Sequence, residues 1–498
     1  MKVCFINVPN LYELVGNDPV IIKEQQGVYP PLGILYMAQY LLNTGRYDVT
    51  VIDAQCDDLS HAEVAERVKE INPDVVGLTA MTFTLVDCKM VIQEIRKRCN
   101  PVIVVGGPHT AIYPNESFNP EGLGADFVVV GEGEMTMDEL CQDIGTGKIN
   151  KGASIAQRTY RQKNFIQDLD QLPFAARELT PIKKYYSVLS EETPSSTAFT
   201  SRGCPFSCSF CDRPALGKGF RPQSPKRVVD EMEHCEKKLG IKDMFFYDDT
   251  FSVSMKRVMD ICSEYNRRKL TIKWDIRTRV NVVNEDLLKA MKGANCTRIH
   301  FGVETAVPRI VKELQKGITA DQVEKAFDMC HRIGIKTLAY FMMGNPTETL
   351  EDVKETLAMA RRIKPDYMQM TILSPFPATT IYMRALKEGV VSGDPWREYA
   401  EKIHDSFRPP LWDAIYSRRE LESHLRWFYR SFYLQPKFVV DRVREVKNFG
   451  QFKRYASAGI GLLKMTLLPE SKMLDYWRTR KAIDPNYEIK QETAVPIT

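Results

Sequence analysis

The stretch Cys204-Pro-Phe-Ser-Cys208-Ser-Phe-Cys211 decides how this sequence is interpreted. Three cysteines fall within eight residues, spaced as Cx3Cx2C, whereas the other nine of the chain's twelve cysteines are scattered singly. Free cysteine is among the most buried residue types, so a small core side chain explains the scattered nine. Three neighbouring thiolates instead suit a soft metal ion or an iron–sulfur cluster.

The surroundings of the three cysteines separate zinc from an iron–sulfur cluster. A tetrahedral zinc site takes a fourth protein ligand nearby, but the next candidates, His234 and Cys235, lie in a predicted helix. Three ligands fit a [4Fe–4S] cluster with one iron left open. We therefore predict that Cys204, Cys208 and Cys211 hold such a cluster; three buried cysteines that meet by coincidence are the alternative.

The cysteine loop follows the first strand of a series in which strands and amphipathic helices alternate. Such alternation gives a parallel sheet, and six strand–helix units fit an open or partial barrel. In such barrels the active site lies at the carboxyl ends of the strands, where the cysteine loop stands. The predicted strands are 197–203, 243–249, 272–278, 298–304, 337–344 and 367–373.

Residues 1–145 show an earlier alternation of buried strands and helices, which is typical of a doubly wound parallel sheet. Ligands of these sheets bind beyond the carboxyl ends of the strands. Those ends carry Thr79–Thr84, Gly106–His109 and Gly131–Glu134. The predicted strands are 3–8, 48–54, 74–82, 101–109 and 126–134.

The remaining segments complete an α/β fold of three domains. Residues 146–195 are polar and interrupted by glycine and proline, so we expect a linker there. The barrel then occupies 196–385, and a helical C-terminal domain occupies 386–498. The predicted fold class is a doubly wound parallel-sheet domain, a partial (β/α)6 barrel and a helical C-terminal segment.

The composition narrows the class of protein further. With 44% hydrophobic and 27% charged residues among 498, the chain is an ordinary globular one, which excludes a disordered or collagen-like protein. It has no uncharged apolar stretch approaching 18 residues and no signal-peptide pattern at its start, so we expect a cytoplasmic protein. The net charge of +4 is too small to indicate nucleic-acid binding by itself.

Residues 418–464 combine eleven Lys or Arg with four Asp or Glu and nine aromatic residues. Three interpretations stay open. The segment is a solvated helical cap over the barrel mouth, or it contacts an anionic membrane, where each basic residue adds ~1 kcal/mol, or it binds nucleic acid. No dedicated RNA-binding domain is visible, so we predict no nucleic-acid partner.

The Cx3Cx2C loop after the first barrel strand resembles the radical S-adenosylmethionine (SAM) superfamily. Phe210, just before the third cysteine, stands where those enzymes use an aromatic residue beside adenine. The resemblance implies that the open iron binds the amino and carboxylate groups of SAM. It also implies that reductive cleavage of SAM gives a 5′-deoxyadenosyl radical, which abstracts hydrogen from a substrate.

Further matches lie at the other strand ends, so the resemblance spans about 195–385. Tyr247–Phe251 resembles the acidic turn near the SAM amino group, and Gly302–Thr305 resembles a GVE(S/T) strand end. Phe341–Thr349 resembles the FxxGxPxET segment, and Ser374–Thr379 resembles (T/S)PxPGT with Ala378 in place of glycine. The implied SAM contacts are Phe210, Asp248, Arg279, Glu304 and Gly344; a structural ion pair is the alternative for Arg279 and Glu304.

The N-terminal domain resembles the cobalamin-binding domain that accompanies some radical SAM enzymes. The matching stretches are Tyr29–Gly33, Gly106–His109 and Gly131–Glu134. The DxHxxG motif is absent, since Asp53–Cys56 has no histidine at the required place, so no histidine is expected to bind cobalt. A domain that keeps the fold without binding B12 is the alternative. The implied cobalamin contacts are Pro31, Thr79, Thr82, Gly106, Gly107, His109, Gly131 and Glu132.

The overall layout is similar to that of anaerobic magnesium-protoporphyrin IX monomethyl ester cyclases, bacteriochlorophyll C-methyltransferases and hopanoid methylases. The resemblance implies a [4Fe–4S] cluster, SAM and cobalamin as cofactors, an electron donor such as flavodoxin or ferredoxin, and a large apolar substrate such as a tetrapyrrole or isoprenoid. No side-chain base deprotonates an unactivated C–H bond near pH 7, so a radical is needed. We predict a C-methyltransferase; oxidative cyclisation and a non-catalytic cobalamin-binding or sensing role are the alternatives.

Overall fold

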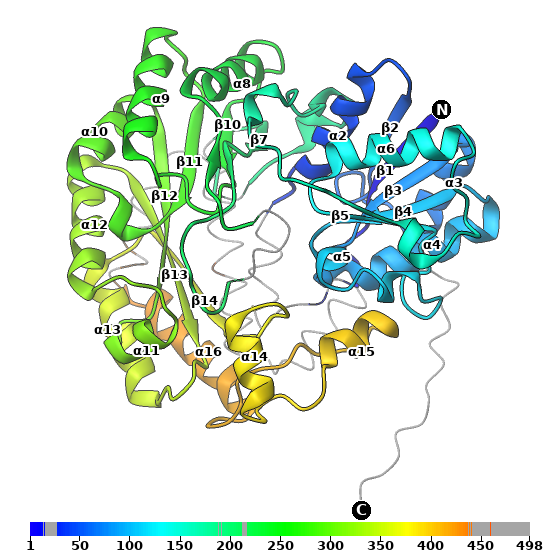
Figure 1. The fold of residues 1–498 in the computed structure, drawn as a ribbon. Helices are drawn as coiled ribbons and strands as arrows, with labels where there is room; N and C mark the ends of the chain where they lie inside the picture. The colour runs from blue at the N-terminus through cyan, green and yellow to red at the C-terminus, as the bar shows by residue number, and fades with distance from the viewer. Residues whose placement is uncertain are drawn as a thin grey trace, which may run out of the picture.

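The computed structural model describes residues 1–12, 14, 27–187, 189–190, 192–211 and 217–436, and the single residues 438, 440 and 459. Two six-stranded parallel sheets dominate this part of the chain. Figure 1 shows them side by side, with the concave face of the second sheet turned toward the first domain. Both the doubly wound domain and the partial barrel predicted from the sequence are confirmed.

The first sheet has the strand order β2-β1-β3-β4-β5-β6. Helices α2 and α6 cover one face, and α3 and α4 cover the other. The strands are β1 Lys2–Asn7, β2 Asp48–Asp53, β3 Val75–Thr79, β4 Val102–Gly106, β5 Phe127–Val130 and β6 Thr159–Arg161. The helices are α2 Leu32–Asn43, α3 His61–Ile71, α4 Leu85–Arg98, α5 Pro108–Ile112, α6 Gly133–Gly145 and α7 Ile155–Arg158.

The second sheet has the order β14-β13-β12-β11-β10-β7, and its first and last strands do not pair with each other, so the barrel is open. Figure 1 shows α9, α10 and α12 along its outer face. Its strands are β7 Ser195–Ala198, β10 Asp243–Phe246, β11 Lys273–Thr278, β12 Cys296–Glu304, β13 Lys336–Met343 and β14 Tyr367–Ile372; β8 Ser201–Arg202 and β9 Arg221–Pro222 form a separate two-stranded ribbon. Its helices are α8 Pro225–Lys237, α9 Met255–Arg267, α10 Glu285–Gly293, α11 Pro308–Glu313, α12 Ala320–Ile333, α13 Leu350–Ile363 and α14 Thr380–Lys387, followed by α15 Pro395–Glu401 and α16 Arg418–Tyr433.

Local sequence signals fix where the barrel helices begin. Helix α12 starts at a capping box between Thr319 and Gln322 and ends at Gly334, whose φ is +81°. Helix α13 starts at a second capping box between Thr349 and Asp352. In a capping box the two side chains satisfy backbone N–H groups that the first turn leaves unpaired. These signals set the loops at the carboxyl ends of β12 and β13, where the candidate site lies.

The segment predicted as a linker, 146–195, contributes β6 to the first sheet through the pairing of Thr159 with Val128. It also supplies Arg177, whose buried guanidinium pairs with Glu231 of α8 at 2.7 Å. The segment therefore packs against both sheets. Its polar groups are in part buried and paired, as Arg177 shows. Polarity in the sequence does not distinguish such a segment from a solvated linker.

The C-terminal helix α16 closes the free edge of β14. The Tyr429 hydroxyl accepts from the Met370 N–H at 2.9 Å and donates to the Met370 carbonyl at 3.0 Å. The Tyr433 hydroxyl makes the same pair of bonds with the backbone of Met368, at 2.9 and 2.5 Å. The described part of the basic, aromatic segment is thus a cap on the barrel. Residues 441–458 and 460–464 of that segment lie outside the described residues.

None of the helices that the structure describes is long and apolar enough to span a bilayer.

Candidate active site

The cysteine loop extends from the end of β8 across the barrel mouth. Cys204 is buried, Cys208 is partly exposed and Cys211 is exposed, and none forms a disulfide. Arg279, just after β11, donates from Nη1 to the Cys208 Sγ at 3.3 Å and lies 4.1 Å from the centre of the Phe206 ring. A neighbouring cation stabilises a thiolate, which is the form that binds metal.

The donor set fits an iron–sulfur cluster by its chemistry, since three thiols share one loop and one of them already faces a guanidinium. The sulfur atoms are not gathered into a ready-made ligand set. Over the described ranges, no three Cys, His, Asp or Glu side chains stand close enough together to hold a metal ion.

Backbone contacts anchor this loop to two barrel helices. The Ser209 N–H donates to the Leu314 carbonyl at 2.9 Å, and its hydroxyl donates to the Glu313 carbonyl at 3.1 Å, at the end of α11. The Ile381 N–H of α14 donates to the Ser209 carbonyl at 3.0 Å. Phe210 packs against the apolar cluster beneath α11 and α14. The aromatic residue next to the third cysteine is therefore held in place by both helices.

Glu304 reaches the same loop from the end of β12. The register of β12 with β13 shifts between Gly302 and Glu304, and Glu304 has a φ of +66°. Its carboxylate accepts from Lys316 Nζ at 2.7 Å, and that ammonium lies 5.7 Å from the centre of the Phe210 ring. Arg279 donates to the Lys316 carbonyl. Contacts through Arg279 and Lys316 thus link four of the residues implied in cluster or SAM binding: Cys208, Phe210, Arg279 and Glu304.

Asp248 contacts the segment that leads into the cysteine loop. Its fully buried carboxylate accepts three hydrogen bonds of 2.6 Å, from the Thr200 N–H, the Thr200 hydroxyl and the Ser201 hydroxyl. Burial raises the pKa of Asp248, while Arg257 and these donors oppose that shift. The side chain therefore holds the segment that leads into Cys204.

Gly344 follows β13 with a φ of +73°, and a Cβ there would lie 3.2 Å from Ile372 and 3.4 Å from Leu421 of α16. Directly after it, the Asn345 N–H and side-chain amide both donate to the buried Glu348 carboxylate, each at 3.1 Å. Burial raises the pKa of Glu348 to about 7. The FMMGNPTET segment is thus a tight, largely buried turn at the carboxyl end of β13.

The cobalamin candidates gather at the carboxyl ends of β3 and β4. Thr82 Oγ1 lies 3.3 Å from His109 Nδ1. Gly107 has a φ of +106°, and a Cβ there would come within 2.9 Å of the Ala80 carbonyl, so only glycine fits. His109 is 2% exposed, and burial lowers its pKa to about 4, so the ring is neutral at pH 7. The other candidates in this group, Thr79 and Gly106, end β3 and β4, and Pro31 precedes α2.

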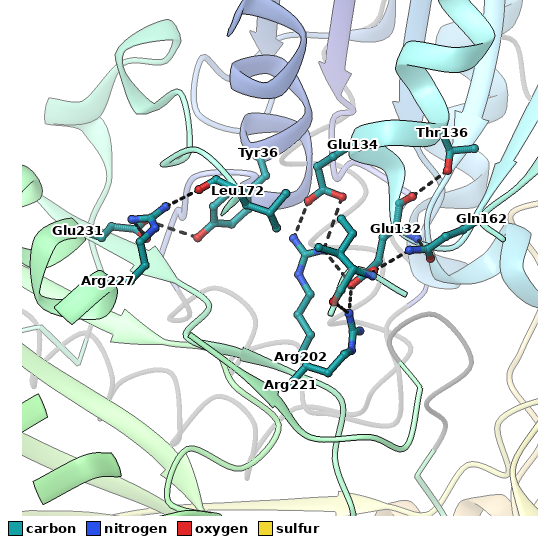
Figure 2. A network of polar contacts seen from close by, with 11 residues as sticks. Tyr36, Glu132, Glu134, Thr136, Gln162, Leu172, Arg202, Arg221, Arg227 and Glu231 are labelled. Atoms are coloured by element: carbon teal, nitrogen blue, oxygen red, sulfur yellow. Dashed lines mark hydrogen bonds and ion pairs between the residues drawn. The ribbon is translucent and has the colours of Figure 1, made fainter. Parts of the chain in front are cut away.

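Glu132 lies between the two domains (Figure 2). One carboxylate oxygen accepts from Arg202 at 2.9 Å and from Arg221 at 2.8 Å, and the other accepts from the Gln162 amide at 2.7 Å and the Ile166 N–H at 2.8 Å. Four donors occupy this carboxylate. We therefore assign Glu132 to the contact between domains rather than to cobalamin; Gly131, with a φ of +97°, packs its backbone against Gln162.

Arg202 and Arg221 are functional residues that the sequence reasoning did not select. Both come from the β8–β9 ribbon, and Arg202 also donates to Glu134 at 2.5 Å, as Figure 2 shows. Arg202 stands two residues before Cys204. The sequence held one signal for this contact, because the acidic Gly-Glu-Gly-Glu loop and the arginine beside the cysteine motif have opposite charges. We name this set of Glu132, Glu134, Arg202 and Arg221 the interdomain clamp.

The carboxyl ends of the two sheets face each other across the clamp. Phe83, after β3, packs edge-on against Phe376, after β14, with ring centres 5.5 Å apart. The Tyr113 hydroxyl, after α5, donates to Asp394 at 3.3 Å. The doubly wound domain and the open barrel therefore meet at the ends where each of these folds binds ligands.

Comparison with known proteins identifies the enzyme class. The B12 binding domain model matches residues 19–141, and the Radical SAM superfamily model matches residues 199–360. An uncharacterized methyltransferase of Pyrococcus horikoshii is 34% identical over 84% of this chain and 91% of its own length. The chain belongs to the radical SAM superfamily, in the group that also carries a B12-binding domain.

Two further relatives and two solved structures agree. The anaerobic magnesium-protoporphyrin IX monomethyl ester cyclase of Rubrivivax gelatinosus is 29% identical over 99% of this chain and 90% of its own. The bacteriochlorophyllide d C-12(1)-methyltransferase of Chlorobaculum tepidum is 26% identical over 78% and 80%. The methyltransferase TsrM from Kitasatospora setae with cobalamin and [4Fe–4S] cluster bound has the same fold, with a TM-score of 0.61, 19% identity and coverage of 78% of both chains. The cobalamin-dependent radical enzyme OxsB gives a TM-score of 0.68 at 16% identity, over 96% of this chain and 75% of that one.

These findings confirm the predicted enzyme class and cofactors. The protein is a cobalamin-dependent radical SAM enzyme whose cofactors are a [4Fe–4S] cluster, SAM and cobalamin. Both methyltransferases and cyclases are among its relatives.

Proposed function

We propose that the protein methylates an unactivated carbon of a large, mainly apolar substrate of the tetrapyrrole type. The observation that carries this proposal is the meeting of the two carboxyl ends, marked by the Phe83–Phe376 contact. This contact supports placing the cobalamin site and the SAM site next to each other. When bound, SAM and the cluster supply a radical that removes hydrogen from carbon, and cobalamin supplies a methyl group.

The chain's own residues bind, orient and exclude water. Cys204, Cys208 and Cys211 hold the cluster, and Arg279 donates a hydrogen bond to the Cys208 sulfur. Phe210 and the backbone at Gly344 flank the adenine of SAM, while Glu304, held by Lys316, faces its amino group. Asp248 acts as a positioning residue, because it fixes the segment before Cys204.

The backbone loops of the first domain cradle the corrin. Glycines at 106, 107 and 131 let the backbone approach a flat ligand closely, as Gly107 shows by its contact with Ala80. Pro31, Thr79, Thr82 and the neutral His109 complete this surface. His61 is occupied, because its Nε2 lies 2.8 Å from the buried Asp87 carboxylate.

No histidine binds the cobalt in this proposal. His61→Ala and His109→Ala variants should leave the electron paramagnetic resonance spectrum of cob(II)alamin in the protein unchanged and free of nitrogen hyperfine splitting. Splitting from an imidazole in the parent protein, lost in either variant, would contradict it.

Oxidative cyclisation is the second candidate, because the relative named as a cyclase matches 99% of this chain. One experiment separates the two. The reduced, reconstituted enzyme is given methyl-labelled SAM, cobalamin and magnesium-protoporphyrin monomethyl ester or a bacteriochlorophyllide, and the products are analysed by mass spectrometry. Methylation adds one labelled CH2 unit, whereas cyclisation gives an oxidised product with no added carbon.

Two partners complete the proposal. A low-potential donor such as flavodoxin or ferredoxin reduces the cluster, and the basic segment 418–464 contacts anionic membrane from which the substrate is drawn. The second point is tested by sedimentation with anionic and neutral liposomes at low salt. If the protein binds neither kind of liposome, the proposed membrane contact is wrong and the catalytic proposal is unaffected.

A further inference from the structure

The inner face of the open barrel carries a belt of partly exposed polar and aromatic side chains. On these strands the outward residues are buried under the helices, while one inward position stays partly accessible. Tyr340 pairs with Gln369 and Gly302, whereas Arg277 pairs with His300, one inward position below Gly302, and its side chain interacts with the Tyr340 phenol. The belt consists of Tyr247, Arg277, Tyr340 and Gln369.

Arg277 is the cation of this belt. Its guanidinium carbon lies 3.9 Å from the centre of the Tyr247 ring, and the Tyr340 phenol interacts with the same group. Tyr29, from the first domain, packs edge-on against Tyr247 with ring centres 5.8 Å apart and closes the belt on that side. Arg277 therefore lies in an aromatic frame and is partly exposed as a residue.

The carboxylates nearest to Arg277 are already paired. One layer below, Asp275 accepts from Arg298 at 2.5 Å and lies 3.4 Å from His300. Above, Glu304 accepts from Lys316 at 2.7 Å. Across the parts of the chain that the structure describes, no carboxylate stands within ion-pair distance of Arg277.

Burial lowers the pKa of Arg277, but the phenols of Tyr340 and Tyr247 and the nearby Asp275 more than offset this, although no carboxylate in the described parts of the chain forms a direct ion pair with it. The planar guanidinium presents paired N–H donors that match a carboxylate. A charged guanidinium that lacks a direct carboxylate partner and matches an anion in shape is what a ligand site requires. Arg277 lies on β11, two residues before Arg279, so its backbone lies roughly 7 Å deeper than the residue that contacts the cysteine loop.

We propose that Arg277, framed by Tyr247 and Tyr340, binds a carboxylate of the substrate and so anchors the apolar body of that substrate beneath the two cofactors. This inference rests on the proposed function and adds to it the anionic group that the substrate must carry. An anchor below the mouth directs the rest of the substrate toward Phe210 and the facing loops of the first domain. The specificity it confers is for apolar molecules that carry one acidic arm.

The test compares protoporphyrin IX with its dimethyl ester, which have the same macrocycle and differ in whether the carboxylates are free. Binding to the reconstituted holoenzyme is followed by fluorescence quenching for the parent protein and for Arg277→Met. We expect the free acid to bind the parent about tenfold more tightly or better, and the variant to lose that preference. Equal binding of both porphyrins to the parent, or a preference that survives in the variant, overturns the proposal.

The carboxylate of SAM is the other source of the same chemistry, and equilibrium dialysis with SAM distinguishes it. Unchanged SAM affinity in Arg277→Met supports the substrate assignment. A loss of SAM affinity assigns the residue to SAM and overturns the proposal.

Thermal unfolding gives a readout that needs no ligand. If Arg277 awaits an anion, Arg277→Met leaves the unfolding midpoint within about 2 °C of the parent, whereas Arg298→Met, which breaks the pair with Asp275, lowers it by more. If neither porphyrin binds, the proposed tetrapyrrole substrate is wrong. The unfolding midpoints of the two variants then test by themselves whether Arg277 is an anion site. A fall in the midpoint for Arg277→Met comparable to that of Arg298→Met makes the residue structural and overturns the inference.

Discussion

Three residues that lack the freedom of glycine adopt left-handed backbone conformations at the barrel mouth. Glu304, Thr347 and Ala378 have φ values of +66°, +63° and +60°, and they follow β12, β13 and β14 in turn. Left-handed backbone costs a non-glycine residue roughly 1–2 kcal/mol. Such strain concentrates where a site requires a particular geometry, and here it marks the ends of three neighbouring strands.

Ala378 stands where the resembling segment has glycine, and its positive φ shows why glycine suits the position. Ala378→Gly relieves the strain of roughly 1–2 kcal/mol, against about 0.4–1 kcal/mol of added entropy in the unfolded chain. We expect a net gain of about 0.5–1 kcal/mol, measured as a higher midpoint in thermal unfolding. Ala153→Gly is the control, because this loop residue has no positive φ and should lose stability. Equal losses in both variants would contradict the strain argument.

Glu348 should make stability depend on pH near neutrality. Burial raises its pKa from 4.5 in the unfolded chain to about 7 in the folded one. The folded protein therefore holds the proton more tightly, so stability is greatest below about pH 4.5 for this group and falls as pH rises to about 7, by at most about 3 kcal/mol.

Glu348→Gln removes this titration. The difference in unfolding midpoint between the variant and the parent should shift in favour of the variant from about pH 5 to about pH 8. Glu351→Gln, three residues further on in the first turn of α13 and 77% exposed, is the control that should show no such change. A difference that is constant with pH would refute the assignment.

The site residues divide according to how far apart their partners lie in the sequence. The cysteines were predictable, because the spacing of ligands on one loop is a local pattern. The role of Asp248 was not, since it bonds Thr200, 48 residues away, and Glu132 pairs with Arg202 across 70 residues. Motif resemblance places such residues at the correct strand ends, but it does not say which partner occupies their carboxylates.

At the scale of elements, periodicity predicted most strands because buried parallel strands are nearly continuous apolar runs. The edge strand β6 has the sequence Thr-Tyr-Arg and only three residues, so no such run exists. The pairs Phe428-Tyr429 and Phe432-Tyr433 belong to the basic, aromatic segment 418–464. The sequence did not show that the phenylalanines are buried and that the tyrosine hydroxyls bond to the free edge of β14, because both features depend on the fold.

The tyrosines of α16 should contribute measurably to stability. Tyr429→Phe and Tyr433→Phe each leave one N–H and one carbonyl of β14 without a partner, and an unsatisfied buried group costs about 1–3 kcal/mol. We expect each variant to unfold at a lower temperature or denaturant concentration, and the double variant to lose more. Tyr186→Phe, at an exposed position, serves as control. Variants as stable as the control would show that water replaces these bonds.

At the scale of the whole molecule, the clamp makes two domains act as one body. Arg202 and Arg221 are about as buried as Glu132, with side-chain exposures of 10%, 8% and 1%. Breaking one partner of a buried pair typically costs 3–5 kcal/mol, roughly, because the other charge is left buried. Since Arg202 lies next to Gly203 and Cys204, a loosened clamp also frees the cysteine loop.

The interdomain clamp should couple the unfolding of the two domains. In calorimetry the parent protein should unfold in one transition, whereas Arg202→Gln should unfold in two, with the B12-binding domain and the barrel melting separately. The Arg46→Gln variant is matched to it, because Arg46 pairs with Asp138 but is 49% exposed, and such pairs contribute about 1 kcal/mol or less. Adding Glu132→Gln to Arg202→Gln should recover part of the loss, since the buried negative charge is then removed. A single transition with an unchanged midpoint in Arg202→Gln would mean that apolar contacts such as Phe83–Phe376 hold the domains together without the clamp.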